Sequence, residues 1–260
     1  MSSIGRNFAY LTFELIKRDV KGRYIGSSLG FFWSFLQPLL QLILFTFVFS
    51  YVLKISILGE RGVENFAFFL FSGLLPWMGI QEMLIRSTTV INEQAPLIKK
   101  LAFPPELLII SIFGSALVHQ FIASFIFIII LMLVGKIFFS FLFLPVLMLS
   151  ELIFISGFCF FFSALNPFFK DTYQAISYIS MIWFYGSPIV YPLSLVPEKL
   201  KKILLLNPLT YLIEAYRDIL LRGKLPGLNF YLFIPFFGII ILFFGYYIFK
   251  KLKKEFSDLI

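Results

Sequence analysis

A run of 23 residues without any Asp, Glu, Lys or Arg, Phe31 to Leu53, constrains this chain more than any other feature. As a helix that rises about 1.5 Å per residue it would be roughly 35 Å long, and the hydrocarbon core of a bilayer is about 30 Å thick. We therefore predict that this run crosses a membrane. Four basic residues precede it, and the positive-inside rule places them on the cytoplasmic side: Lys17, Arg18, Lys21 and Arg23.

The composition is that of a membrane protein. Only 14% of the residues are charged and 60% are hydrophobic, whereas soluble domains carry about 25% charged residues. The net charge of +8 comes mostly from the flanks of apolar runs, where topology and anionic headgroups account for it. We therefore expect membrane lipids as partners and no nucleic acid. The single cysteine, Cys159, excludes an intrachain disulfide.

Apolar runs divide the chain into six predicted spans within one domain, residues 1–260. They cover residues 31–53, 66–85, 107–135, 141–165, 173–196 and 229–249. An even number of spans returns the C-terminus to the side of the N-terminus. The basic tail at positions 250–254 agrees, because basic flanks are cytoplasmic. The predicted fold is an all-α integral membrane protein with six transmembrane helices and both termini in the cytoplasm.

The segment before the first span predicts an amphipathic helix. Helical spacing from Phe8 to Arg23 places four charged residues on one stripe, with apolar side chains roughly opposite: Glu14, Lys17, Arg18 and Lys21. Such a helix lies in the interface of the inner leaflet. Asp19 interrupts its apolar side.

The segment from Ser194 to Leu228 is predicted to lie outside. Its uncharged stretch of 11 residues, Ile203 to Ile213, is too short to span and contains Pro208. A Gly-Ser-Pro break at 186–188 precedes it, and proline interrupts helical hydrogen bonding. We favour short re-entrant helices that dip into the outer leaflet between spans five and six. A solvated loop with an amphipathic helix on the surface is the alternative.

The loop between spans two and three, Arg86 to Pro105, predicts a short cytosolic helix. Asn92 can cap it, Pro96 suits an early helical position, and Pro104 with Pro105 end it. Two interpretations are open. The helix either docks another protein, as coupling helices do in many transporters, or rests on lipid as an amphipathic connector.

Ionisable groups within the predicted spans are candidates for function. Glu151 lies near the middle of span four, where a carboxylate costs at least about 2.5 kcal/mol unless it is protonated, paired or facing water. It is a candidate for a translocation path, and hydrogen bonding to a neighbouring Ser or Tyr is the alternative. His119 is more often a packing residue than a ligand. Glu82 is expected to reach the headgroups or Arg86, one turn on.

Four tyrosines are further candidates for lining the path. A phenol within a span needs a polar partner or a wet cavity, and aromatic faces stack on the C–H faces of sugars. Most of the 37 phenylalanines, by contrast, face lipid or fill the bundle. The candidates are Tyr51, Tyr178, Tyr185 and Tyr191.

Missing motifs narrow the function. No G-x-x-x-x-G-K-[ST] phosphate loop occurs, so we expect no ATPase activity of the chain itself. One His and one Cys exclude a His/Cys metal cluster. No nucleophile and base stand at a recognisable spacing. We therefore predict no catalytic residue, no metal site and no cofactor bound by this chain.

Six sequence motifs resemble those of one protein family, and they follow one another in the same order as in that family. They are RDVKGRYIGSSLGFFWSFLQPLLQLILFTFVFS at 18–50, FSGLLPW at 71–77, KKLAFPPELL at 99–108, NPFFKD at 166–171, GSPIVYP at 186–192 and NPLTYLIEAYRDILL at 207–221. Together they cover almost the whole chain. The chain resembles the ABC-2 type polysaccharide export permeases, which export O-antigen, capsule and teichoic acid polymers, and most nearly the O-antigen branch.

The resemblance implies a homodimer in the cytoplasmic membrane, with two copies of a separate ATPase subunit that uses ATP and Mg²⁺. The substrate would be a lipid-linked polysaccharide. The resemblance implies a cytosolic gate at the N-terminal helix, with Lys17, Arg18, Lys21 and Arg23. It implies ATPase coupling by Asn92, Glu93, Pro96, Leu97, Lys99 and Lys100. It implies an outer gate with Pro197, Asn207, Pro208, Glu214 and Arg217.

Three other functions stay open. An ABC-2 exporter of drugs or lipids would differ in whether its path accommodates a hydrated glycan. A passive channel would conduct without nucleotide. A membrane enzyme acting on lipid-linked sugars would need catalytic residues that the sequence does not display.

Overall fold

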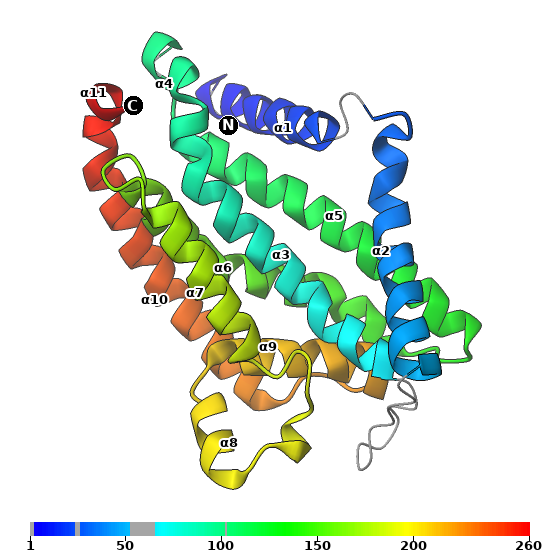
Figure 1. The fold of residues 1–260 in the computed structure, drawn as a ribbon. Helices are drawn as coiled ribbons and strands as arrows, with labels where there is room; N and C mark the ends of the chain where they lie inside the picture. Colours follow the sequence, from blue (N-terminus) through cyan, green and yellow to red (C-terminus); the bar gives the residue numbers. More distant parts are fainter. Residues whose placement is uncertain (1–2, 24–26, 53–65, 102) are drawn as a thin grey trace.

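A computed structural model describes residues 3–23, 27–52, 66–101 and 103–260. Every regular element in these ranges is a helix. Figure 1 shows long helices running beside one another, α1 (Ser3–Gly22) crossing one end of them and α8 (Glu198–Leu204) at the opposite end. The all-helical prediction is therefore confirmed for the described part of the chain.

Within the described ranges, four helical stretches are long and apolar enough to cross a membrane: Phe66–Glu93, Glu106–Leu133, Phe139–Leu165 and Leu228–Leu259. The first two are α3 and α5. The third consists of η3 (Phe139–Phe143) and α6 (Leu144–Leu165). The fourth begins with α10 (Leu228–Leu252), continues through η6 (Lys253–Glu255) and ends in α11 (Phe256–Leu259). These stretches correspond to predicted spans two, three, four and six.

The first and fifth predicted spans are shorter or interrupted helices. The first comprises η1 (Gly30–Phe32), α2 (Trp33–Phe45) and the π-helical η2 (Thr46–Val52), while Leu53 lies outside the described residues. The fifth is α7 (Thr172–Tyr185), so the prediction of a span to Val196 was wrong. The helix ends because Gly186 and Pro188 break it, although the apolar run continues.

Close backbone contact joins α6 to α10. A Cβ atom at Gly157 would collide with the Ile241 backbone, and one at Gly245 would collide with the Gly157 carbonyl. A Cβ at Gly238 would lie 3.0 Å from the Phe154 Cα. In a bilayer, such small residues let helices approach and gain van der Waals contact. The glycines therefore hold α10 against the centre of the bundle, where α6 also packs on α3.

Shorter helices cover the two ends of the bundle. At one end α1 lies against α5, with Ile16 filling the space above Gly114. α4 (Ala95–Leu101) and α11 lie at the same end, whereas α8 and α9 (Pro208–Arg217) lie at the other (Figure 1). The predicted cap at Asn92 was wrong, because α3 continues through Asn92 to Glu93. The amphipathic helix at the N-terminus is confirmed as a helix.

Candidate functional site

An ion pair and a hydrogen bond fasten α1 to the long helices. The Asp19 carboxylate pairs with Arg86 of α3 at 2.5 Å, and it accepts a hydrogen bond from the Ser115 hydroxyl of α5. Burial disfavours the charged form of Asp19. The hydrogen bonds and the positive charges of Arg86 and Arg23 outweigh burial and lower the pKa of Asp19. We name Asp19, Arg86 and Ser115 the α1 latch.

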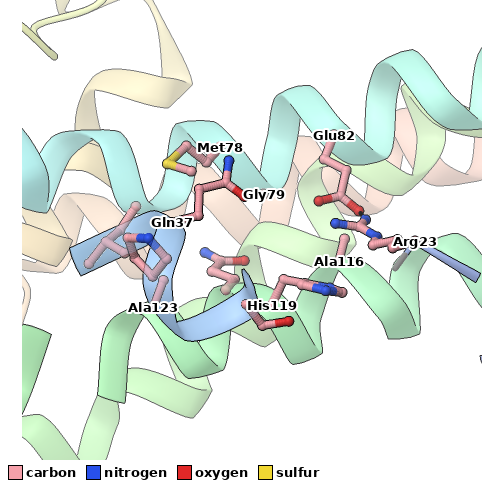
Figure 2. A pocket seen from close by; sticks show the side chains of 12 residues that line it. Arg23, Gln37, Met78, Gly79, Glu82, Ala116, His119 and Ala123 are labelled. Atoms are coloured by element: carbon pink, nitrogen blue, oxygen red, sulfur yellow. Dashed lines mark ion pairs between the residues drawn. The ribbon is translucent and has the colours of Figure 1, made fainter. Parts of the chain in front are cut away.

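A second ion pair lies beside the latch. Arg23, just after α1, pairs with Glu82 of α3, and Figure 2 shows the two side chains facing each other near His119 of α5. The Glu82 carboxylate also accepts a hydrogen bond from Arg86 at 3.2 Å, so the predicted contact between these residues is confirmed. His119 Nδ1 lies 2.7 Å from the Ser115 carbonyl oxygen. Polar contacts thus join α1, α3 and α5 at the α1 end of the bundle.

A cavity of about 110 Å³ lies between α2, α3 and α5. A buried water needs roughly 10–15 Å³ of such space, so the cavity has room for several. Gln37 of α2, Glu82, His119 and Gln120 supply polar atoms to its wall (Figure 2). Gln37 and Glu82 also line a wider hollow that is open at the α1 end. We name the cavity and this hollow together the inner funnel.

Three polar side chains meet in the protein interior at the base of the funnel. The Glu151 carboxyl group of α6 is fully buried. It accepts hydrogen bonds from the Tyr216 hydroxyl of α9 at 2.6 Å and from Gln120 Nε2 of α5 at 2.8 Å. Gly79 of α3 leaves room for them, since a Cβ atom there would lie 2.8 Å from Glu151 Oε1. We name Glu151, Gln120 and Tyr216 the buried triad.

The triad bears on the two interpretations of Glu151. Hydrogen bonding to a tyrosine inside the bundle is what the structure shows. Among the residues that the structure describes, neither Glu151 Oε1 nor Gln120 Oε1 has a hydrogen-bond partner. Gln120 also lines the cavity, so water can reach the edge of the triad. A role for Glu151 in a translocation path stays a prediction.

The predicted gate residues of α1 mostly face outward. Lys17, Arg18 and Lys21 are exposed, and Lys17 makes an exposed ion pair with Glu14 at 3.6 Å. Arg18 borders the wide end of the funnel, and Arg23 reaches the cavity. Asp19 was not among the residues predicted to be functional. Its signal was a charge on the apolar side of an amphipathic helix.

The candidate path tyrosines lie in different places. Tyr51, Tyr178 and Tyr185 are exposed on the described chain. Tyr51 borders one apolar groove, with Phe47 and Phe68 of α3. Tyr185 borders another, which it shares with Tyr191, Pro197 and α8. The Tyr191 hydroxyl donates to the Tyr185 carbonyl oxygen at 3.0 Å. Only Tyr185 and Tyr191 of the predicted path are therefore brought together.

Asn207 organises the start of α9, in the predicted outer gate. Its side-chain oxygen accepts from Leu209 N at 3.1 Å, which caps the helix, with Pro208 at the first helical position. The same oxygen accepts from Trp183 Nε1 of α7 at 3.1 Å. The Asn207 amide donates to Ser187 Oγ at 2.8 Å. One side chain thus ties α9 to the end of α7.

Arg217, also of the predicted outer gate, is fully buried. Its guanidinium pairs with Glu214 at 2.8 Å and stacks 3.5 Å from the centre of the Phe69 ring of α3. Burial disfavours the charged form of Glu214, but Arg217 and Arg222 outweigh it and lower the pKa of Glu214. Arg222 pairs with Glu214 at 2.8 Å. These contacts hold α9 against α3.

The predicted coupling residues occupy two helices. Asn92 and Glu93 end α3, whereas Pro96, Leu97, Lys99 and Lys100 belong to α4. Glu93, Pro96 and Lys99 are exposed, and Leu97 is half-buried. Ile98 faces the protein interior and is 8% exposed. α4 therefore presents Pro96 and Lys99 outward at the α1 end of the bundle. In the described part of the chain no group of three or more His, Cys, Asp or Glu residues could hold a metal ion.

Comparison with known proteins gives long matches. Residues 10–221 match the family described as ABC-2 type transporter. The O-antigen export system permease protein RfbA of Myxococcus xanthus is 28% identical over 251 residues, 95% of this chain and 94% of the relative. A protein of the same name from Klebsiella pneumoniae is 31% identical over 260 residues, 98% and 97% of the two chains. The polysialic acid transport protein KpsM of Escherichia coli is 25% identical over 250 residues, 92% of each.

Proposed function

The chain belongs to the family of ABC-2 type transporters, and on this premise we propose that it is the membrane subunit of an ATP-driven polysaccharide exporter. Its substrate is a lipid-linked polysaccharide of O-antigen type, which it moves across the cytoplasmic membrane. The observation that carries this proposal is similarity over nearly the whole chain to permeases named for O-antigen export, at 28% and 31% identity. Export of a drug or a different lipid finds no comparable support.

The proposed topology has six spans, both termini in the cytoplasm and two copies of the chain around a shared path. In the part of the chain that the structure describes, four helical stretches are long and apolar enough to span. In Figure 1, α2 and α7 also run from the α1 end of the bundle towards the α8 end. This arrangement supports six crossings, with α1, α4 and α11 on the cytoplasmic side. α8 and α9 then form the re-entrant outer segment.

The inner funnel supports transport of a hydrated substrate. Burying a sugar hydroxyl without a hydrogen-bond partner costs about 2–7 kcal/mol, so a glycan needs a polar or wet route. The polar side chains of Gln37, Glu82 and His119 line the funnel from the α1 end towards the interior of the bundle. In the proposed mechanism, α1 covers this entrance and the α1 latch holds it closed. Exposed Tyr178 and Tyr185 offer aromatic faces on which sugar rings stack where two copies meet.

Energy comes from a separate ATPase subunit in this proposal. Two copies bind ATP and Mg²⁺ and push on α4, whose Lys99 is exposed. Because α4 directly follows α3, a push on α4 tilts α3. Arg86 of α3 then pulls on Asp19 and moves α1. At the outer end, Arg217 connects α3 to α9 by its contact with the Phe69 ring, so the same tilt reaches the outer gate.

Charge reversal on α4 tests the proposal. Replacing Lys99 and Lys100 by Glu is expected to weaken ATPase binding and to stop the appearance of the polysaccharide at the cell surface. ATPase binding is measured by co-purification and export by surface labelling of the glycan. Intact binding and intact export in this variant would contradict docking at α4. Export that continues in a strain whose ATPase cannot hydrolyse ATP would instead identify a passive channel.

Accessibility of an introduced cysteine tests the topology separately. In a Cys159→Ser background, Lys201→Cys on α8 should react with a membrane-impermeant maleimide added outside intact spheroplasts. A matched variant, Lys99→Cys on α4, should react only after the membrane is opened. The reverse pattern would contradict the six-span arrangement.

A further inference from the structure

We propose that the partner ATPase binds two segments of this chain at once, α4 and the C-terminal tail, Lys253–Leu259. The inference rests on the proposed function, in which α4 is the docking helix. It adds a second contact region and specifies the charge of the partner surface that faces it.

α4 is too small to form the whole interface. It has seven residues, and a specific protein interface takes roughly 20–30 residues from each side. Ile98 is directed inward and is 8% exposed, while Pro96 and Lys99 face outward. Neighbouring segments at the same end of the bundle must therefore supply most of the contact area.

The tail is one such neighbour, and its residues 253–259 add to the contact area of α4. Its helix α11 contacts α4, and both lie at the α1 end of the bundle (Figure 1). Two anchors hold the tail in place. Phe256 is fully buried, with its ring 5.6 Å from that of Phe249, and Lys253 pairs with Glu106 at the start of α5. A surface held in place before binding loses less entropy when a partner docks.

The charge order along the tail favours a protein over a lipid surface. Lys250, Lys251 and Lys254 come first and suit anionic headgroups. Glu255 and Asp258 follow and are both exposed. Carboxylates are repelled by the anionic inner leaflet, so the end of the tail faces water. The composite surface therefore carries the positive charge of Lys99 and the negative charges of Glu255 and Asp258. It fits a partner surface that is negative opposite Lys99 and positive opposite the two carboxylates.

The test reverses the two acidic charges of the tail. The permease, purified with its ATPase from the producing cell, is separated from it, reconstituted in nanodiscs of zwitterionic lipid and titrated with the ATPase. Glu255→Lys with Asp258→Lys should raise Kd at least tenfold, since like charges then face each other across the interface. Glu198→Lys, an exposed reversal on α8 at the opposite end, is the matched control and should leave Kd unchanged. The unfolding midpoint of each variant checks that the fold is intact.

The outcomes separate this inference from the proposed function. If Lys99→Glu raises Kd and the tail reversal does not, the tail is no part of the interface, while docking at α4 stands. If neither changes Kd, docking at α4 itself is wrong, and the inference falls with it. If the tail reversal changes Kd only when the nanodiscs contain anionic lipid, the tail binds the membrane, and the inference is likewise overturned.

Discussion

Asp19→Asn is the substitution that tests the α1 latch most sharply, because it removes the carboxylate charge and keeps the side-chain shape. A hydrogen bond to a charged group contributes about 1.5–3 kcal/mol, and Asp19 accepts from both Arg86 and Ser115. Its side chain is 22% exposed, and Arg86 keeps Glu82 as a partner at 3.2 Å. Both facts favour the lower end of the range. We expect the variant to weaken the docking of α1 by about 1–2 kcal/mol.

Cysteine protection measures this change. In a Cys159→Ser background, a cysteine replaces Leu15, which is 8% exposed and reacts with maleimide only when α1 lifts. Because about 1.4 kcal/mol corresponds to a factor of ten, Asp19→Asn should raise the labelling rate about 5- to 30-fold. The control is Glu14→Gln, which removes an exposed ion pair with Lys17 at 3.6 Å and should change little. A wild-type labelling rate in Asp19→Asn would refute the latch.

Three further predictions concern pH and packing. The pKa of Asp19 is lowered from 3.8. The α1 latch therefore contributes its full stabilisation of α1 above pH 3.8, and this stabilisation is lost as the pH falls through the lower pKa of the folded state. Amide exchange in α1, corrected for intrinsic rates, should accelerate only in that acid range. Gly157→Ala forces α6 from the backbone of α10 and should cost about 1–3 kcal/mol of stability in detergent, whereas Gly227→Ala, with open space around it, should cost little. Tyr216→Phe removes the hydrogen bond that the hydroxyl donates to Glu151 and the one that it accepts from Gln120, and it should lower the unfolding midpoint by the equivalent of about 1 kcal/mol; an unchanged midpoint would show that neither bond contributes.

Long uninterrupted helices could be predicted because lipid requires them. A backbone in hydrocarbon must form its hydrogen bonds within the protein, so a long apolar run predicts a helix. α5 begins at Glu106 and ends at Leu133, close to the predicted 107–135. α7 could not be delimited in this way, since apolar residues continue past the break at Gly186. Hydropathy indicates which segments lie in an apolar environment, but it does not indicate where a helix ends.

The candidate site was predictable only where its contacts are local. Glu82 and Arg86 lie one turn apart, and their contact followed from helical spacing. Asp19 and Arg86 are 67 residues apart, and their contact depends on α1 folding across α3 and α5. The contact of Tyr216 with Glu151 likewise depends on α9 reaching the interior of the bundle. A charge on an apolar face was the one sign in the sequence that Asp19 has a partner.

ATP-dependent movement of the glycan in sealed vesicles tests the central claim most directly. Inverted membrane vesicles that contain this chain and its ATPase expose the cytoplasmic side, and labelled lipid-linked polysaccharide is supplied on that side. ATP should transfer the label into a compartment protected from added glycosidase, and omitting either protein or ATP should abolish the transfer. Equal protection of the label without ATP, or with this chain alone, would contradict the account.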